Sequence, residues 1–256
     1  MQQKYLVTYG NGIFTKQKER LKKEAEETKW FSRVFSYGRE DVEEFYQQHQ
    51  NFIDNNPKGF GLWIWKPWLI KKALAELQES DILIYCDAGV SFINAGEFKE
   101  GREKAFEGYI NLLNSSSRPV LAFTPDVPLY LNKQFSKMFF LKKLKLHNDD
   151  IFLNSAQPEA TVVLMRKTSF TTAFIEKWAY LVLCENYKLV DDNLYDEKEL
   201  LGFLGTHRHD QSILSALSYK NNTHVLNGQH IYGLSPFWAG RMTDKGKKKF
   251  YADPPL

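Results

Sequence analysis

An aspartate follows directly after an uninterrupted apolar run in the stretch "DILIYCDAG", residues 81–89. Such a run is typical of a central strand that is buried on both faces of a parallel sheet. Asp87 is then expected at the carboxyl edge of the sheet, where open α/β sheets bind their ligands. A charge at the end of a buried strand needs a partner. Three roles are open for Asp87: binding a divalent cation, capping the next helix or holding a ribose hydroxyl.

A second group of reactive side chains is crowded into "GTHRHDQ", residues 205–211, just before an apolar helical pattern. Asp210 stands where an N-cap or a first-turn acid would stand. A cap accounts for Asp210, but it does not account for His207, Arg208 and His209 beside it. Two imidazoles and a guanidinium suit an anionic ligand, a metal ion or a developing negative charge.

The third candidate is the aromatic stretch "GFGLWIWKP", residues 59–67. Trp63 and Trp65 fall on one face if the stretch is extended, and core packing accounts for at least one of the two indoles. Lys66 follows, and its ammonium either reaches a phosphate or is simply solvated. The sequence has no P-loop, no G-x-S-x-G, no HExxH and no Cys-His zinc spacing, so a serine or cysteine nucleophile is unsupported.

The elements that must position these residues alternate between strand and helix. Strands are expected at residues 4–9, 30–37, 81–86, 118–123, 160–166 and 223–227, and helices at residues 16–29, 40–54, 67–77, 103–113, 169–184 and 209–219. This alternation predicts an α/β fold with a mainly parallel central sheet covered by helices. Tyr9-Gly10 and Tyr37-Gly38 end the first two strands, so three strand ends are expected to meet at one crevice with Asp87. Each glycine either lets the backbone approach a ligand or makes a plain tight turn.

Composition limits the class of protein. The chain has 256 residues with no linker or repeat, which predicts one domain, 1–256. A net charge of +3 with scattered basic residues argues against nucleic acid as a partner. The nearest basic patch, Lys245 and Lys247–Lys249, is interpreted as a solvated tail, the alternative being weak attraction to acidic membranes or phosphates.

Cys86 and Cys184 are expected to be buried free thiols. No signal peptide and no apolar run of about 20 residues is present, which predicts a soluble cytoplasmic protein.

Four linked blocks resemble a known family. They are "GFGLWIWKPWLIKKAL", "DILIYCDAG", "ATVVLMRKT…FIEKW" and "HRHDQSILSAL". Together they are similar to a group of small nucleotide-sugar-dependent glycosyltransferases with the A-type fold, found in bacterial surface-polysaccharide loci and in large DNA viruses of algae. The similarity covers most of residues 4–230. It implies a Rossmann-like domain with a nucleotide-binding half, about residues 1–125, and an acceptor half with the C-terminal tail, about residues 126–256.

The resemblance also implies roles for the candidate residues. Asp87 falls where such enzymes place the acid that meets a metal-bound diphosphate, and Asp210 falls where inverting members place their base. The donor, of UDP or GDP type, is then expected to contact Tyr9, Gly10, Tyr37, Trp65, Lys66, Asp87, Ala88, Gly89 and Arg208. A divalent cation, Mn²⁺ or Mg²⁺, would be held by Asp87 with His207 or His209. The "DAG" sequence departs from the usual pattern, because Gly89 stands where a second carboxylate is expected, and this puts metal dependence in doubt.

The favoured function is therefore transfer of a sugar from a nucleoside diphosphate donor to a saccharide acceptor, with inversion, in glycan or surface-polysaccharide synthesis. Two other functions stay open. A sugar nucleotidyltransferase is disfavoured because "TYGNGIFTKQK" has glycines without the usual run of basic residues. A carbohydrate- or nucleotide-binding protein of the same fold, without turnover, is favoured by the single acid of "DAG".

Overall fold

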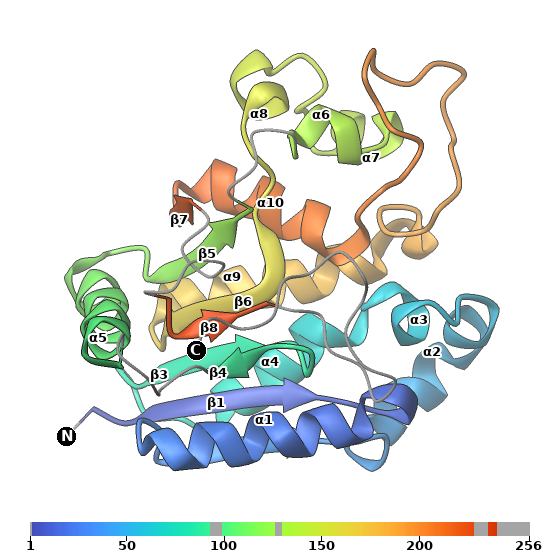
Figure 1. Cartoon of the computed structure of the whole chain (residues 1–256). Coiled ribbons are helices and arrows are strands. Elements are labelled where there is room, and N and C mark those ends of the chain that lie inside the picture. Colours follow the sequence, from blue (N-terminus) through green and yellow to red (C-terminus); the bar gives the residue numbers. More distant parts are fainter. Residues whose placement is uncertain (1, 93–98, 126–129, 228–234, 240–256) are drawn as a thin grey trace.

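The computed structural model describes residues 2–92, 99–125, 130–227 and 235–239. A six-stranded sheet runs through the molecule in the order β2-β1-β3-β6-β5-β7 (Figure 1). Its strands are β1 (Lys4–Tyr9), β2 (Arg33–Tyr37), β3 (Ile82–Cys86), β5 (Val120–Thr124), β6 (Glu159–Arg166) and β7 (His224–Asn227). Two short strands, β4 (Ser91–Phe92) and β8 (Phe237–Trp238), pair separately.

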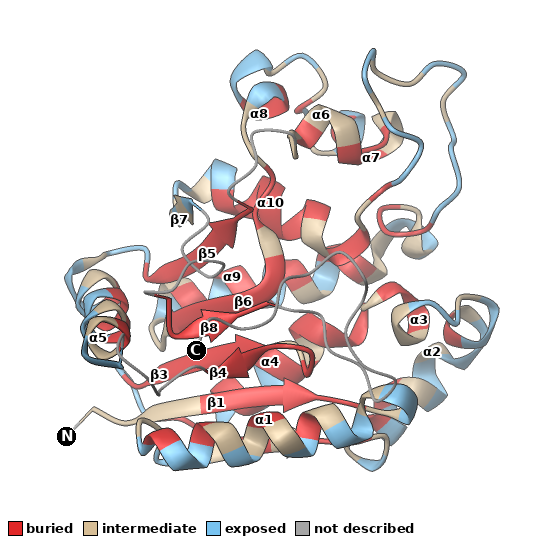
Figure 2. Ribbon diagram, viewed as in Figure 1, coloured by how far each residue is buried: buried red, intermediate tan, exposed pale blue. Residues whose placement is uncertain are grey.

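Helices cover both faces of the sheet. The longer ones are α1 (Thr15–Thr28), α2 (Glu43–Asn55), α4 (Trp65–Ala75), α5 (Lys99–Ser115), α9 (Ser169–Leu183) and α10 (His209–Asn221). Short helices α3 (Gly59–Leu62), α6 (Asn132–Phe135), α7 (Met138–Lys143) and α8 (Asp150–Asn154) lie in the connections, as do the 3-10 turns Gly12–Phe14, Glu40–Val42 and Cys184–Tyr187. In Figure 2 the strands of the sheet are largely buried, whereas the outer side of α1 is exposed.

Two hydrophobic clusters lie on opposite faces of the sheet. Within β3, Leu83 and Tyr85 belong to one cluster, which includes residues of α2, α4, α9 and α10. Ile82, Ile84 and Cys86 belong to the other, which includes residues of α1 and α5. Because successive side chains of a strand point to opposite faces, an unbroken apolar run is what a strand covered on both sides requires.

The structure confirms the α/β class with a central, mostly parallel sheet. The strand at residues 159–166 is the exception, because β6 runs antiparallel to both β3 and β5. Its apolar sequence satisfies two buried faces in either direction, so composition alone does not reveal which way it runs. Consequently Ala160 and Thr161, at the start of β6, lie at the same edge as the ends of β1 and β3.

The fold also bears on the predictions for the cysteines, the short helices and the domain organisation. Cys86 is buried as predicted, but Cys184 is only half-buried, and both thiols are free. The short helices of residues 132–154 were not predicted, and Lys245 and Lys247–Lys249 lie outside the described residues. No helix in the described part of the chain is long and apolar enough to cross a membrane. The central sheet takes strands from both residues 1–125 and residues 126–256, and the assignment of one domain stays a prediction.

Candidate active site

A cavity of about 710 Å³ opens where β1 and β3 end. Four segments line it: residues 9–14 after β1, residues 57–66 before and at the start of α4, residues 87–89 after β3, and residues 206–211 at the start of α10. Ala160 and Thr161 of β6 complete the lining. The three separate sequence blocks that carry candidate residues therefore meet at one cavity, as expected from the carboxyl edge of an α/β sheet.

Lys66 bridges two of these blocks from the floor of the cavity. Its Nζ lies 3.1 Å from Oδ2 of Asp210 and 3.3 Å from Oδ1 of Asp87, and it donates a hydrogen bond of 2.9 Å to the carbonyl oxygen of Ala160. The Lys66 side chain is only 3% exposed. Burial lowers the pKa of Lys66, but the two carboxylates outweigh burial and hold the pKa above its ordinary value. The ammonium is thus a fixed cation whose three N–H groups have protein oxygens as partners.

Asp87 has the partners that its position demands. The hydroxyl of Tyr85, two residues earlier in β3, donates to Oδ1 of Asp87 at 2.6 Å, and Lys66 provides the opposite charge. The backbone N–H of Asp87 donates to the carbonyl oxygen of Thr161 at 2.9 Å, which fixes the end of β3 against β6. Arg20 of α1 holds the turn that follows by donating to the carbonyl oxygens of Ala88 and Val90. No helix begins at this turn, so Asp87 is not a cap.

Asp210 is also not the cap of its helix. The N-cap of α10 is Arg208, without a side-chain cap bond, and Asp210 lies in the first turn with its side chain 4% exposed. Burial raises the pKa of Asp210 from 3.8 to about 6, against the opposing charge of Lys66. A carboxylate with a pKa near neutrality is suited to accept a proton during a reaction.

The two histidines anchor a loop rather than face a ligand. Nε2 of His207 lies 2.8 Å from the carbonyl oxygen of Leu189, and Nδ1 accepts from the backbone N–H of Lys137 at 3.4 Å. Nδ1 of His209 lies 2.6 Å from the carbonyl oxygen of Val190, and Nε2 lies 2.9 Å from Nζ of Lys58. Burial lowers the pKa of His209 to about 4 and that of His207 well below its ordinary value, so both imidazoles are neutral at pH 7.

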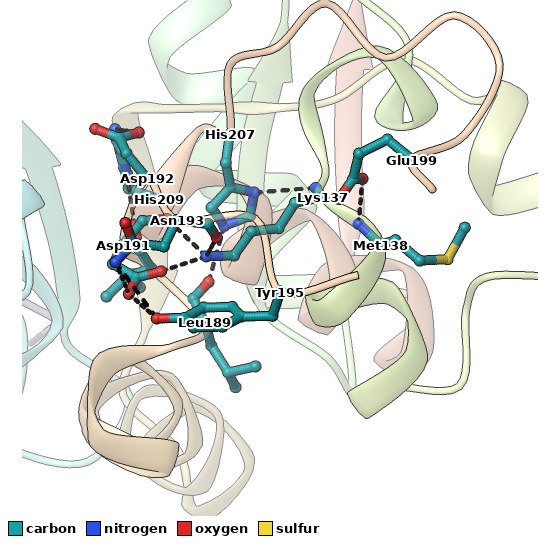
Figure 3. Close-up of polar contacts among 11 residues, drawn as sticks. Lys137, Met138, Leu189, Asp191, Asp192, Asn193, Tyr195, Glu199, His207 and His209 are labelled. Atoms are coloured by element: carbon teal, nitrogen blue, oxygen red, sulfur yellow. Dashed lines mark hydrogen bonds and ion pairs between the residues drawn. The ribbon is translucent and has the colours of Figure 1, made fainter. Parts of the chain in front are cut away.

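A buried lysine, Lys137, contacts the same loop beside His207 (Figure 3). Nζ of Lys137 lies 2.5 Å from Oδ1 of Asp191 and donates to the carbonyl oxygens of Asp191 and Asn193. The hydroxyl of Tyr195 donates to the other oxygen of the Asp191 carboxylate. Lys137 and the histidine pair therefore fix the segment around residues 189–195 beside the cavity, and this network is structural support.

The predicted ligand set for a divalent cation is not assembled. Oδ1 of Asp87 is shared by Tyr85 and Lys66, and both ring nitrogens of each predicted histidine ligand have partners. In the chain as far as the structure describes it, no group of three or more His, Cys, Asp or Glu side chains is placed to hold a metal ion. The residues that line the cavity therefore do not fit a resident Mn²⁺ or Mg²⁺. The assignment of His207 and His209 as ligands is corrected for this reason, and metal dependence of the reaction stays a prediction.

Other predicted donor residues are divided between the cavity and the core. Tyr9, Gly10, Trp65, Ala88, Gly89 and Arg208 line the cavity together with Lys66 and Asp87. Tyr37 does not, because its ring packs beside Phe35 within the core, with Nζ of Lys72 above it at 5.2 Å. Gly10 serves close packing rather than ligand approach, since a Cβ there would lie 2.6 Å from the carbonyl oxygen of Phe14.

The stretch around Trp63 and Trp65 is not extended, contrary to the expectation. Five consecutive residues have positive φ: Gly59 (60°), Phe60 (53°), Gly61 (80°), Leu62 (55°) and Trp63 (61°). The α3 segment is therefore one turn of left-handed helix, a conformation that costs an L-residue about 1–2 kcal/mol. Gly59 and Gly61 adopt it without that cost. The right-handed helix α4 begins directly afterwards, at Trp65.

Sequence reasoning missed several residues of the cavity. Thr161 is there because β6 is antiparallel, and Lys58 and Phe60 are there because of the left-handed turn. The paired glycines at 59 and 61 were a signal for an unusual turn, whereas no pattern in the sequence indicates the direction of β6.

Comparison with known proteins finds no matching family model and no matching curated protein. Among solved structures, the chain is similar to mouse xyloside xylosyltransferase 1, with a TM-score of 0.43, 9% identity and coverage of 87% of this chain and 84% of that chain. It is also similar to the glycosyltransferase GlyE of Streptococcus pneumoniae, with a TM-score of 0.42 and 13% identity. That match covers 90% of this chain but only 46% of GlyE. At TM-scores this low, a functional proposal has to stand on the site itself.

Proposed function

We propose that the protein is a glycosyltransferase that moves a sugar from a nucleoside diphosphate donor, of UDP or GDP type, to a saccharide acceptor with inversion. The observation that carries this proposal is the pair of carboxylates joined by Lys66 on the floor of the cavity. One of them, Asp210, is buried and has a pKa of about 6. The resemblance of the sequence blocks around these residues to A-type glycosyltransferases supports the same reading.

Asp210 is the base in this proposal. An acceptor hydroxyl attacks the anomeric carbon of the donor sugar, a new C–O bond forms, and the hydroxyl proton passes to the Asp210 carboxylate. The bond between the anomeric carbon and the phosphate oxygen breaks, and its electron pair stays on the diphosphate. At pH 7 most Asp210 side chains are ionised, because a pKa of about 6 lies below that pH. Lys66 positions the carboxylate and balances its charge.

The leaving diphosphate needs positive charge near it. Lys66 is an unsuitable direct partner, since its N–H groups are directed at Asp87, Asp210 and Ala160. Arg208 and Lys58 line the same cavity and carry positive charge. The Arg208 guanidinium lies over the ring of Phe135, 3.9 Å from its centroid, which favours one orientation of this flexible side chain. We therefore assign diphosphate stabilisation to Arg208 and Lys58.

The nucleoside end of the donor is placed at the end of β1. Tyr9 and Trp65, which are 5% and 4% exposed, form the buried part of an aromatic wall there, and the half-buried ring of Phe60 stacks beside Tyr9 with centroids 6.3 Å apart. The Trp65 indole is fixed, because its N–H donates to the carbonyl oxygen of Gly59 at 2.9 Å. A flat base can stack on such a wall. A panel of UDP- and GDP-sugars identifies which base and which sugar are bound.

The test is release of nucleoside diphosphate from a panel of UDP- and GDP-sugars, with methyl glycosides as acceptors. We expect Asp210→Asn to bind the donor as the wild type does but to lose transfer by about 10²–10⁴-fold, since an amide cannot accept the proton. Asp150→Asn is the matched control, because Asp150 is exposed on α8, outside the cavity, and should leave turnover unchanged. Donor binding without any release in the wild type would instead identify a binding protein, and no donor binding at all would refute the proposal.

A further inference from the structure

The left-handed turn at residues 59–63 is held in place by many contacts. Backbone hydrogen bonds close it: from Phe60 to Pro57 at 3.1 Å, from Gly61 to Asn56 at 2.9 Å, from Leu62 to Lys58 at 2.8 Å, and from Trp63 to Gly59 and Ile64 to Gly61 at 3.2 Å each. Leu62 is buried to 1% exposure and anchors the turn in the core. A strained conformation of this kind persists only where its surroundings determine it, and such strain concentrates at functional sites.

Phe60 and Trp63 pack against the hydrophobic core without being enclosed by it. Both rings are only half-buried, and both line the cavity. The Trp63 side chain lies directly over Gly59, because a Cβ at Gly59 would lie 2.4 Å from the indole ring. The left-handed turn therefore presents two large aromatic rings to the cavity.

The two rings stand on different sides of the cavity. Phe60 stacks beside Tyr9 at the end of β1, with centroids 6.3 Å apart. Trp63 stacks beside His209, with centroids 5.6 Å apart and planes at 30°, and His209 directly precedes Asp210 in the chain. No described residue accepts a hydrogen bond from the Trp63 indole N–H. Trp63 thus brings a half-buried indole ring and an N–H donor to the cavity next to the proposed base.

We propose that Trp63 is the platform for the acceptor sugar and that the left-handed turn is the element that sets acceptor specificity. This inference rests on the proposed function, because it uses the position of the base to assign the acceptor side. The apolar face of a pyranose ring packs on the indole, and its hydroxyls remain available to Asp210. The indole combines apolar area with one N–H donor, which suits a ring that is apolar on its faces and polar at its edge.

Binding is tested first, without turnover. Saturation-transfer NMR follows methyl β-glucopyranoside, β-galactopyranoside and α-mannopyranoside in the presence of protein and UDP or GDP. We expect at least one glycoside to receive saturation from the wild type, to lose it with Trp63→Ala and to keep part of it with Trp63→Phe. Trp68→Ala is the matched control, since Trp68 is also half-buried, on α4, but lies outside the cavity lining. No transfer to any glycoside in the wild type, or equal transfer in Trp63→Ala, overturns the inference.

Kinetics then separates this inference from the proposed function. With a donor and acceptor that turn over, Trp63→Ala should raise the acceptor KM about tenfold, which corresponds to about 1.4 kcal/mol, and should leave the donor KM and donor hydrolysis within about twofold. A rise in the donor KM instead would place the indole on the donor side and overturn the inference, while the glycosyltransferase proposal would stand. If glycoside binding depends on Trp63 but no nucleotide sugar is turned over, the sugar platform would stand and the glycosyltransferase proposal would be overturned.

Discussion

Replacement of Asp210 by asparagine should change how the stability of the protein depends on pH. The folded state raises the pKa of Asp210 from 3.8 to about 6, so between these values the folded protein keeps a proton that the unfolded chain has lost. Stability falls with pH wherever the folded state binds more protons than the unfolded state. The wild type should therefore lose stability from Asp210 between about pH 4 and pH 6.

The size of the effect follows from the shift. A shift of about two pKa units corresponds to about 3 kcal/mol. Below pH 4 the protonated acid and the amide are nearly isosteric and equally uncharged, so the two proteins should have similar free energies of unfolding. Above pH 6 the asparagine variant should be more stable than the wild type by up to about 3 kcal/mol. The base is thus retained at a cost to stability.

Urea unfolding of both proteins from pH 4 to pH 7.5 provides the measurement. His207 and His209 also affect this range: their lowered pKa values make stability rise with pH. Both proteins contain them, so the difference between variant and wild type isolates Asp210. In the wild type Lys66 stays protonated throughout, because the carboxylates of Asp210 and Asp87 hold its pKa above the ordinary value, and Asp87 remains its partner in the variant. A difference that does not change between pH 4 and pH 7 would show that Asp210 has an ordinary pKa, and the argument for a base near neutrality would be refuted.

Three further outcomes are expected. Lys66→Met should destabilise the protein by about 3–5 kcal/mol in urea unfolding at pH 7, because it leaves buried Asp210 without its cation; a loss below about 1 kcal/mol would contradict the fixed-cation role. Gly61→Ala should lower the melting temperature more than Gly12→Ala, since both positions have positive φ but only a Cβ at Gly61 meets a neighbour, Ile53 Cγ1 at 2.7 Å; equal effects would argue against the tight left-handed turn. Donor turnover should persist in excess chelator, because the described residues that line the cavity do not form a ligand set for a divalent cation. Abolished turnover that Mn²⁺ restores would overturn that conclusion.

Local pattern was enough to predict the elements that carry the site. The unbroken run of residues 82–86 predicts a strand covered on both faces, and the structure has β3 there, packed into both hydrophobic clusters. A charge directly after that strand requires a partner, and Asp87 has two. The helix predicted at residues 209–219 begins at His209 in the structure, one residue before Asp210. These features depend on neighbours in the chain, so the sequence by itself determined them.

Only the tertiary structure decided what these residues do together. Lys66 and Asp210 lie far apart in sequence, yet their charged atoms are 3.1 Å apart, because α4 and α10 both begin at the same edge of the sheet. The sequence predicts His207 and His209 as ligands, but in the folded chain one ring nitrogen of each is hydrogen-bonded to a backbone carbonyl oxygen, of Leu189 and Val190 respectively. The direction of β6 and the contact between Lys66 and Asp210 arise from packing between distant segments, and the free energy of that packing has no signature in local periodicity.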